Sequence, residues 1–320
     1  MIAPAKFGAA NALAAVQKSI PLLQTAAEST FKEGGCVSCH SGNIVNSAVA
    51  AARAKGVKVN DAADTGMAKG TLLFYAAAAE GFLERTDSPA VEILTYALVA
   101  LGDEGIQPDR TTDAMVHNIA AQQLASGYWP PKGIVRPPTS DNFFTHAAFA
   151  VRVFKQYAPP ARKAEYDERI ARIARAVSAA EPSTTEDAVM QLLGLKWAGA
   201  DSARIQRSMK SVMALQRKDG GWGQTPLLPT DAYATGTALH ALFEAGTSPS
   251  APEYRKGVQF LINTQAADGS WHVASRTAKF QPYFEGGFPY GHDQWISHWG
   301  SGWATIALSH ALPERRASAR

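Results

Sequence analysis

The sequence is poor in several features that would assign a protein to a particular class. Only two cysteines occur in 320 residues, no apolar stretch approaches the 18 residues that a membrane-spanning helix needs, and no run of five basic residues is present. The 31 basic and 28 acidic residues leave a net charge of +3. We therefore expect no transmembrane segment and no nucleic-acid partner. With 46% hydrophobic and 18% charged residues, the composition is that of an ordinary globular protein.

The two cysteines stand close together, and a histidine follows them directly. Cys36, Cys39 and His40 form Cys-x-x-Cys-His, the attachment sequence for a c-type haem. In such a site the thiols bond to the haem vinyl groups, and the imidazole is the proximal iron ligand. The alternative is a structural pair, either reduced or joined in a short-loop disulfide. Zinc is disfavoured because no second cysteine pair completes a set of four ligands.

The predicted haem site also implies a cellular compartment for the protein. A chain with attached haem must be exported, so we expect a periplasmic or exported bacterial protein. The start at Met1 lacks a charged region followed by a long apolar core, so the leader is expected to have been removed already.

A repeat dominates the rest of the chain. Gln-x-x-x-Gly-x-Trp occurs at residues 123–129, 216–222 and 265–271, each time at the end of an amphipathic pattern. A polar or proline-rich loop follows each copy, and then a helix rich in alanine, threonine and glycine. Because strand signals are almost absent and the spacing corresponds to helical hairpins, the sequence predicts an all-α ring or solenoid.

The third copy, with the helix pattern of Tyr254 to Leu261 before it, resembles the QW motif of squalene and oxidosqualene cyclases. Protein prenyltransferase β subunits share this motif more loosely. The resemblance covers about residues 64 to 312 and is most specific at the second and third copies. It implies an α/α toroid, with an inner ring of helices inside an outer ring. The segment from Phe280 to Trp295 is similar to bacterial members that carry Cys-x-x-Cys-His ahead of the repeats.

The catalytic residues of these families are incomplete here. Squalene-hopene cyclases use an Asp-x-Asp-Asp motif whose middle carboxylate is the acid, and the four residues beginning at Asp231 resemble it only in the first carboxylate. Tyr233 stands at the acid position, and it also stands where prenyltransferases have a zinc-binding cysteine. Their later histidine falls near Gly300. Asp231 is thus a weak catalytic candidate, and we expect Asp231, Asp141 and Asp187 to be helix N-caps.

Aromatic residues gather between Phe280 and Trp303, together with His292 and His298. This composition predicts the wall of a pocket, although the rings could instead serve only to close the ring of helices. If haem is present, either histidine is a candidate for the sixth iron ligand. Met67 is a further candidate if the N-terminal region is a shortened cytochrome-like module. Met67 is expected to be a core residue, because a methionine at helical spacing usually is.

Two functional hypotheses follow from these observations. The first is a periplasmic haem c protein that transfers electrons to a redox partner on a toroid without cyclase chemistry, with residues 1–60 packed continuously on a toroid of residues 61–320. The second is an enzyme or binding protein that holds an apolar isoprenoid ligand inside the toroid, with structural cysteines. The first rests on a motif and the second on the fold, which alone is weak evidence of function.

Overall fold

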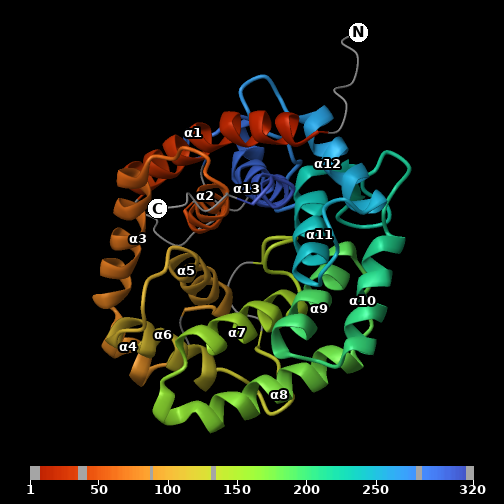
Figure 1. Cartoon of the computed structure of the whole chain (residues 1–320). Coiled ribbons are helices and arrows are strands. Elements are labelled where there is room, and N and C mark those ends of the chain that lie inside the picture. The colour runs from red at the N-terminus through yellow and green to blue at the C-terminus, as the bar shows by residue number, and fades with distance from the viewer. Residues whose placement is uncertain (1–7, 35–41, 87–88, 131–134, 279–282, 315–320) are drawn as a thin grey trace, which may run out of the picture.

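The computed structural model describes residues 8–34, 42–86, 89–130, 135–278 and 283–314. Two concentric rings of helices make up the fold (Figure 1). The inner ring consists of α2 (Asn43–Ala54), α5 (Val91–Asp103), α7 (Phe143–Tyr157), α9 (Thr185–Ala198), α11 (Ala232–Glu244) and α13 (Gln294–His310). The outer ring consists of α1 (Ala9–Gly34), α3 (Asp61–Ala76), α4 (Ala79–Glu84), α6 (Arg110–Ala121), α8 (Lys163–Ala179), α10 (Ser202–Ala214) and α12 (Pro252–Thr264). The predicted all-α toroid is confirmed.

Short elements complete the structure described here. Two 3₁₀ turns, η1 (Pro160–Arg162) and η2 (Gly291–Asp293), precede α8 and α13. The strands β1 (Trp222–Gly223) and β2 (Thr230–Asp231) pair antiparallel just before α11.

The two rings differ in side-chain pattern because they meet different surroundings. On α8, Tyr166, Ile170, Ile173 and Val177 are buried, while charged residues cover the outer face. The inner helices are buried over most of their surface, and small residues let them approach closely. A Cβ atom added at Gly236 of α11 would lie 2.6 Å from the Trp303 backbone of α13.

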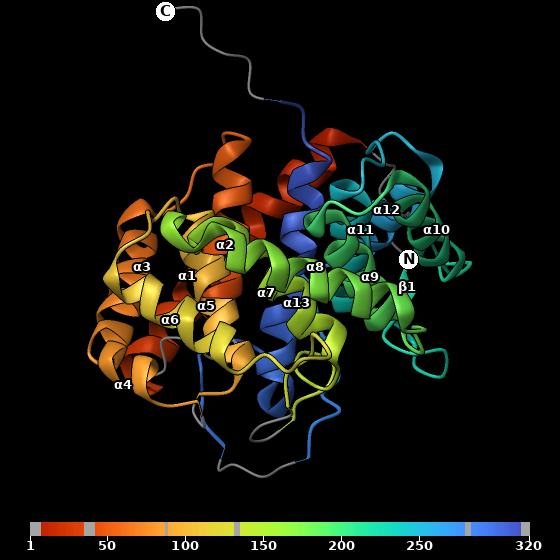
Figure 2. The same ribbon diagram turned by 90° about the horizontal axis from the view of Figure 1, so that it is seen from below.

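The inner helices run parallel to one another, because residues at matching positions are in contact. Tyr96, six residues into α5, meets Phe149 of α7 and Trp299 of α13. Near the start of the next two helices, Glu186 of α9 bonds to Tyr233 of α11. In the side view, α13 runs the height of the ring from the 283–293 segment at its lower end (Figure 2).

The three Gln/Trp turns share one hydrogen-bond arrangement. Each tryptophan Nε1 donates over 2.8 Å to a backbone carbonyl in the outer helix before it: Trp129 to Ile119, Trp222 to Val212 and Trp271 to Leu261. Each glutamine amide donates to the carbonyl of its own turn glycine and to a carbonyl of the next outer helix. The motif therefore joins each outer helix to its neighbour.

Glycine is required in these turns for two reasons. Gly127, Gly220 and Gly269 have φ values of 91°, 94° and 95°, in the left-handed region. A Cβ at Gly269 would also lie only 2.5 Å from the carbonyl oxygen of Lys18. The turn thus needs both the backbone conformation and the close approach that glycine permits.

The N-terminal hairpin closes the ring. Gln265, in the third Gln/Trp turn, donates to the carbonyl of Ala15 on α1 over 2.9 Å. Thr305 of α13 donates to Ser19 of α1, also over 2.9 Å. The boundary that the sequence suggests at residue 60 falls between α2 and α3, and α1 and α2 belong together as one hairpin of the described ring.

Candidate active site

A buried carboxyl group lies where three helices of the inner ring, α7, α9 and α11, meet. Glu186 is the second residue of α9 and is only 3% exposed. Its Oε1 atom accepts hydrogen bonds from Thr145 Oγ1 of α7 and from the Tyr233 hydroxyl of α11, both over 3.2 Å. No described residue donates to or accepts from Oε2. One oxygen is thus held in place, and the other is available to a ligand.

The surroundings of Glu186 favour its neutral form. Burial, and to a smaller extent the nearby Asp141 carboxylate, raise the pKa of Glu186 to about 8. The two hydroxyl donors act in the opposite direction, because they stabilise the carboxylate. At neutral pH most Glu186 side chains therefore carry a proton.

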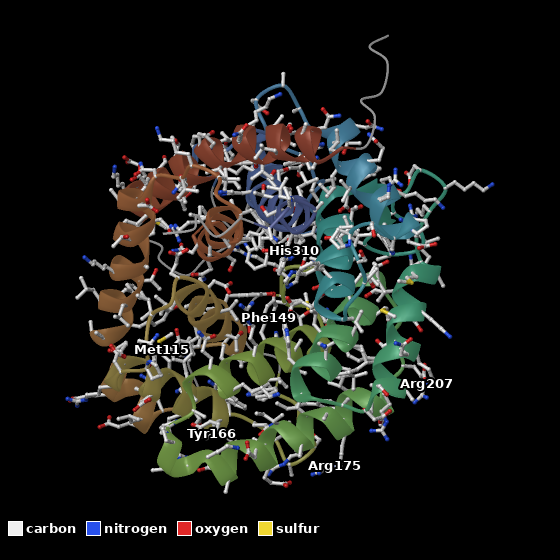
Figure 3. All side chains as sticks on the ribbon, in the orientation of Figure 1. Met115, Phe149, Tyr166, Arg175, Arg207 and His310 are labelled. Carbon is white, nitrogen blue, oxygen red and sulfur yellow. The ribbon has the colours of Figure 1, made fainter. Side chains whose placement is uncertain are left out.

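A series of aromatic rings in contact with one another joins the inner helices near Glu186. The Tyr96 ring centroid lies 4.7 Å from that of Trp299 and 5.0 Å from that of Phe149. The row continues from Phe149 to Trp197 over 6.1 Å and from Trp197 to His240 over 6.5 Å. Phe149 and His310 lie toward the middle of the ring, whereas Arg175 and Arg207 project from the outer surface (Figure 3). We call Tyr96, Phe149, Trp197, Trp299 and His240 the aromatic row.

A second carboxyl group lies beside Tyr96. Glu92 Oε2 is 3.5 Å from His146 Nε2, and burial raises the pKa of Glu92. Burial lowers the pKa of His146 to about 4, so the contact joins a neutral imidazole and a carboxyl rather than two charges. The pair joins α5, which carries Glu92, to α7, which carries His146.

Asp231, the weak catalytic candidate from the sequence, has both oxygens engaged. Its Oδ1 atom accepts from the Ala234 amide over 2.8 Å as the N-cap of α11, as expected. Its Oδ2 atom accepts from Gln224, which in turn accepts from Arg276. Enclosure of the carboxyl raises the pKa of Asp231 to about 6. With these bonds Asp231 fixes the start of α11.

The other two expected N-caps differ from the structure. Thr184 caps α9, and Asp187 at the third helical position bonds back to the Thr184 amide in a capping box. Asn142, one residue beyond Asp141, caps α7 by accepting from the Thr145 amide. In each case a nearby residue is the N-cap, because its side-chain oxygen accepts the hydrogen bond from the backbone amide of the first turn.

The sequence does contain a pattern that points to Glu186, but it is missed when the Asp-x-Asp-Asp motif is aligned on Asp231. Residues 184–187 read Thr-Thr-Glu-Asp, with carboxyls at the third and fourth positions of Asp-x-Asp-Asp. Glu186 stands at the position of the middle acid. Matching the motif by its first aspartate selects Asp231, whereas matching it by the acid selects Glu186.

The aromatic segment at the end of the chain divides between two environments. Tyr283 and Phe284 are 48% and 42% exposed and do not line the axis. Trp299 and Trp303, on the helical part, are buried on the inner side of α13. The buried rings of this segment thus lie on α13, and the expectation that the segment forms a pocket wall stays a prediction.

The candidate haem residues are placed only in part. Cys36, Cys39 and His40 lie outside the described residues. His292 is exposed, with the Tyr283 ring edge-on at 4.9 Å. Met67 is buried in the core, where it was expected.

His298 has the most specific surroundings of the three distal candidates. It is buried against Phe288, whose ring is stacked on it at 4.5 Å, and it bonds to the backbone of Leu23. Its Nε2 atom has no hydrogen-bond partner. Burial lowers the pKa of His298 to about 3, so the imidazole is neutral.

The described residues contain neither a cluster of metal ligands nor a membrane-spanning helix. Within those residues no group of three or more His, Cys, Asp or Glu side chains is arranged to hold a metal ion. Over the same ranges, the helices are too short or too polar to cross a membrane.

Comparison with known proteins identifies relatives of this architecture. Residues 183–290 match the squalene-hopene cyclase C-terminal domain, a stretch that includes the second and third Gln/Trp turns but not the first. A squalene–hopene cyclase of Bradyrhizobium diazoefficiens is 33% identical over 100 residues, which is 27% of this chain. The chain matches only 15% of that enzyme's length.

Solved structures share the fold over nearly the whole chain. A variant of the type II terpene cyclase MstE from Scytonema, in complex with its substrate geranylgeranyl dihydroxybenzoate, has a TM-score of 0.56 and 13% identity, covering 94% of this chain and 98% of its own. A glycosidase variant has a TM-score of 0.58 and 10% identity, covering 93% and 98%. The fold is thus compatible with more than one chemistry. In architecture this chain is a terpene-cyclase-like α/α toroid, with its sequence similarity to squalene-hopene cyclases concentrated at residues 183–290.

Proposed function

We propose that this protein binds an apolar isoprenoid ligand along the aromatic row and that Glu186 donates a proton to it. The observation that carries the proposal is a buried, protonated carboxyl whose Oε2 atom has no partner among the described residues, beside the rings of Tyr96 and Tyr233. Apolar walls with one fixed polar group are typical of sites for such ligands. The similar fold of a cyclase that binds a geranylgeranyl compound supports this class of ligand.

The arrangement suits proton transfer to a carbon–carbon double bond. The Glu186 proton would form a new C–H bond from the π electrons of the alkene, leaving a carbocation and a carboxylate. Thr145 and Tyr233 already donate to Oε1 and would stabilise that carboxylate. The faces of Trp299 and Phe149 would stabilise the cation. When the product cation loses a proton to the Glu186 carboxylate, a new carbon–carbon double bond forms and the carboxyl returns to its starting state.

Binding of geranylgeraniol, followed by quenching of tryptophan fluorescence, tests the proposal. Phe149→Ala is expected to weaken binding by about ten- to a hundredfold, because it removes buried contact area worth roughly 1.5–3 kcal/mol. Phe154→Ala is the matched control: Phe154 is also buried on α7 but contacts Tyr166 of α8 at 5.1 Å, away from the axis. Absence of binding to the wild-type protein, or an equal loss in both variants, contradicts the proposal.

We also propose, as a separate function, that Cys36 and Cys39 attach haem c and that His40 binds its iron in an exported, electron-transferring protein. The motif itself supports this, and so does His298. Its ring is bonded to the Leu23 backbone and leaves Nε2 without a partner, as ligating histidines are commonly held. Bound haem would supply one-electron chemistry. His298 would then be the sixth ligand, ahead of exposed His292 and core Met67.

Intact mass spectrometry tests haem attachment. Protein exported from cells with haem-maturation machinery is expected to exceed the polypeptide mass by one haem. Cys36→Ala with Cys39→Ala is expected to return the mass to that of the chain alone. An unmodified wild-type mass, under conditions that mature a control cytochrome, contradicts this second proposal.

A further inference from the structure

A second group of polar atoms lies between α11 and α13 of the inner ring, next to the aromatic row. His240 of α11 and Trp303 of α13 have ring centroids 5.3 Å apart and are 8% and 4% exposed. His240 Nε2 and Trp303 Nε1 are both buried without a hydrogen-bond partner. Leaving two polar atoms unsatisfied on neighbouring helices costs stability, so their retention calls for a physical explanation.

His240 packs between tryptophans of the two neighbouring inner helices, α9 and α13. One neighbour is Trp197 of α9, with ring centroids 6.5 Å apart, and Trp303 is the neighbour on the other side. The Arg152 guanidinium of α7 lies 5.4 Å from the Trp197 ring centroid. Side chains from α7, α9, α11 and α13 thus converge on the inside of the ring.

The charges nearby favour a neutral ligand atom over an anion. The one guanidinium in the group, Arg152, is already paired with Asp103, which also accepts from Ser47. His240 Nδ1 shares a hydrogen bond with His310 Nε2 over 3.0 Å, so one of the two rings must offer a lone pair. The Trp303 indole can only donate. A neutral oxygen could accept from Trp303 and, as a hydroxyl, also complete the bonding of His240.

We propose that His240 and Trp303 bind a hydroxyl or carbonyl oxygen at one end of the isoprenoid ligand, while Glu186 acts on its hydrocarbon part. This inference rests on the proposed function. Seven residues of α11 separate Tyr233, the partner of Glu186, from His240, which corresponds to about 10 Å along the helix. The ligand is therefore an oxygenated isoprenoid, not a plain hydrocarbon.

Binding of a matched pair of ligands tests this inference. Geranylgeraniol and the hydrocarbon in which hydrogen replaces its hydroxyl are presented in the same detergent micelles, and both affinities are measured by fluorescence quenching. The wild-type protein is expected to prefer the alcohol by about tenfold, the equivalent of one recovered hydrogen bond. Trp303→Phe, which keeps an aromatic ring but removes Nε1, is expected to bring the ratio of affinities close to one.

Trp129→Phe provides a control outside the aromatic row. The Trp129 Nε1 atom donates to the Ile119 carbonyl over 2.8 Å in the first Gln/Trp turn, so its loss is expected to leave the ratio unchanged. If Trp303→Phe fails to fold, His240→Phe removes the other nitrogen and is expected to lower the ratio in the same way. Equal binding of alcohol and hydrocarbon by the wild-type protein, or an unchanged ratio in the folded variant, overturns the inference alone. Failure of both ligands to bind overturns the proposed function with it.

Discussion

Trp271→Ala is expected to lower the free energy of unfolding by about 3–5 kcal/mol. The indole is fully buried, its Nε1 atom donates to the Leu261 carbonyl, and its backbone amide donates to Ser301 of α13. Removing the ring leaves a cavity beneath the turn that binds α12 to α1 through Gln265 and Ala15. Because this turn closes the ring, the loss affects contacts between the two ends of the described chain.

Urea unfolding followed by far-UV circular dichroism measures this effect. Trp271→Phe fills part of the space but loses the Leu261 hydrogen bond, so it is expected to fall between the wild type and Trp271→Ala. Leu227→Ala removes an almost fully exposed side chain and is expected to change stability by less than about 0.5 kcal/mol. A loss of under about 1 kcal/mol in Trp271→Ala would show that the turn is not a structural link.

The repeat in the sequence predicts the toroid well, because each Gln/Trp turn encodes a local arrangement. Glutamine, glycine and tryptophan each have a fixed partner that recurs in all three copies. The role of α1 is not encoded in this way, since residues 1–60 contain no copy of the motif. Its place in the ring depends on Ala15 and Ser19, whose partners are about 250 or more residues away in the sequence.

The site is less predictable from sequence than the fold. Aromatic content points to α13, but only the packed structure shows that Trp299 and Trp303 face inward while Tyr283 faces solvent. His240 carries no motif at all, and its surroundings come from four helices. Glu186 could be found from the sequence by its place in a four-residue pattern. Its pKa depends on burial, which the pattern does not contain.

The second large effect concerns Glu186 itself, and it has a signature in stability before any substrate is added. The folded protein holds a proton on Glu186 up to a pKa of about 8, whereas the unfolded chain releases it near 4.5. The stabilisation from this proton is complete below pH 4.5 and is lost as pH rises toward 8. As pH rises across this window, the unfolding free energy of the wild type is expected to fall relative to that of Glu186→Gln by about 1.4 kcal/mol per pH unit.

Comparison with Glu186→Gln isolates this carboxyl from others that titrate in the same range. Glu104, whose pKa burial also raises to about 8, is present in both proteins and cancels in the difference. The buried histidines act in the opposite direction: burial lowers the pKa of His240 to about 3, so the stability it contributes is lost as pH falls below about 6.5. A pH-independent difference between wild type and variant contradicts a protonated Glu186.

Catalysis supplies the decisive test of the same residue. Glu186→Gln keeps the size and hydrogen-bonding capacity of the side chain but has no acidic proton, so turnover of a polyprenyl substrate is expected to fall by at least about 10²-fold. Geranylgeraniol binding is expected to change little, because the aromatic row is intact.

Two control variants accompany this test. Glu186→Asp restores a carboxylic acid on a side chain shorter by one methylene and is expected to recover part of the turnover. Asp187→Asn, the matched control on the next residue, weakens the capping box but leaves the acid in place. If Glu186→Gln turns over substrate as the wild type does while Asp187→Asn does not, the proton comes from elsewhere and Glu186 serves only to join α7, α9 and α11.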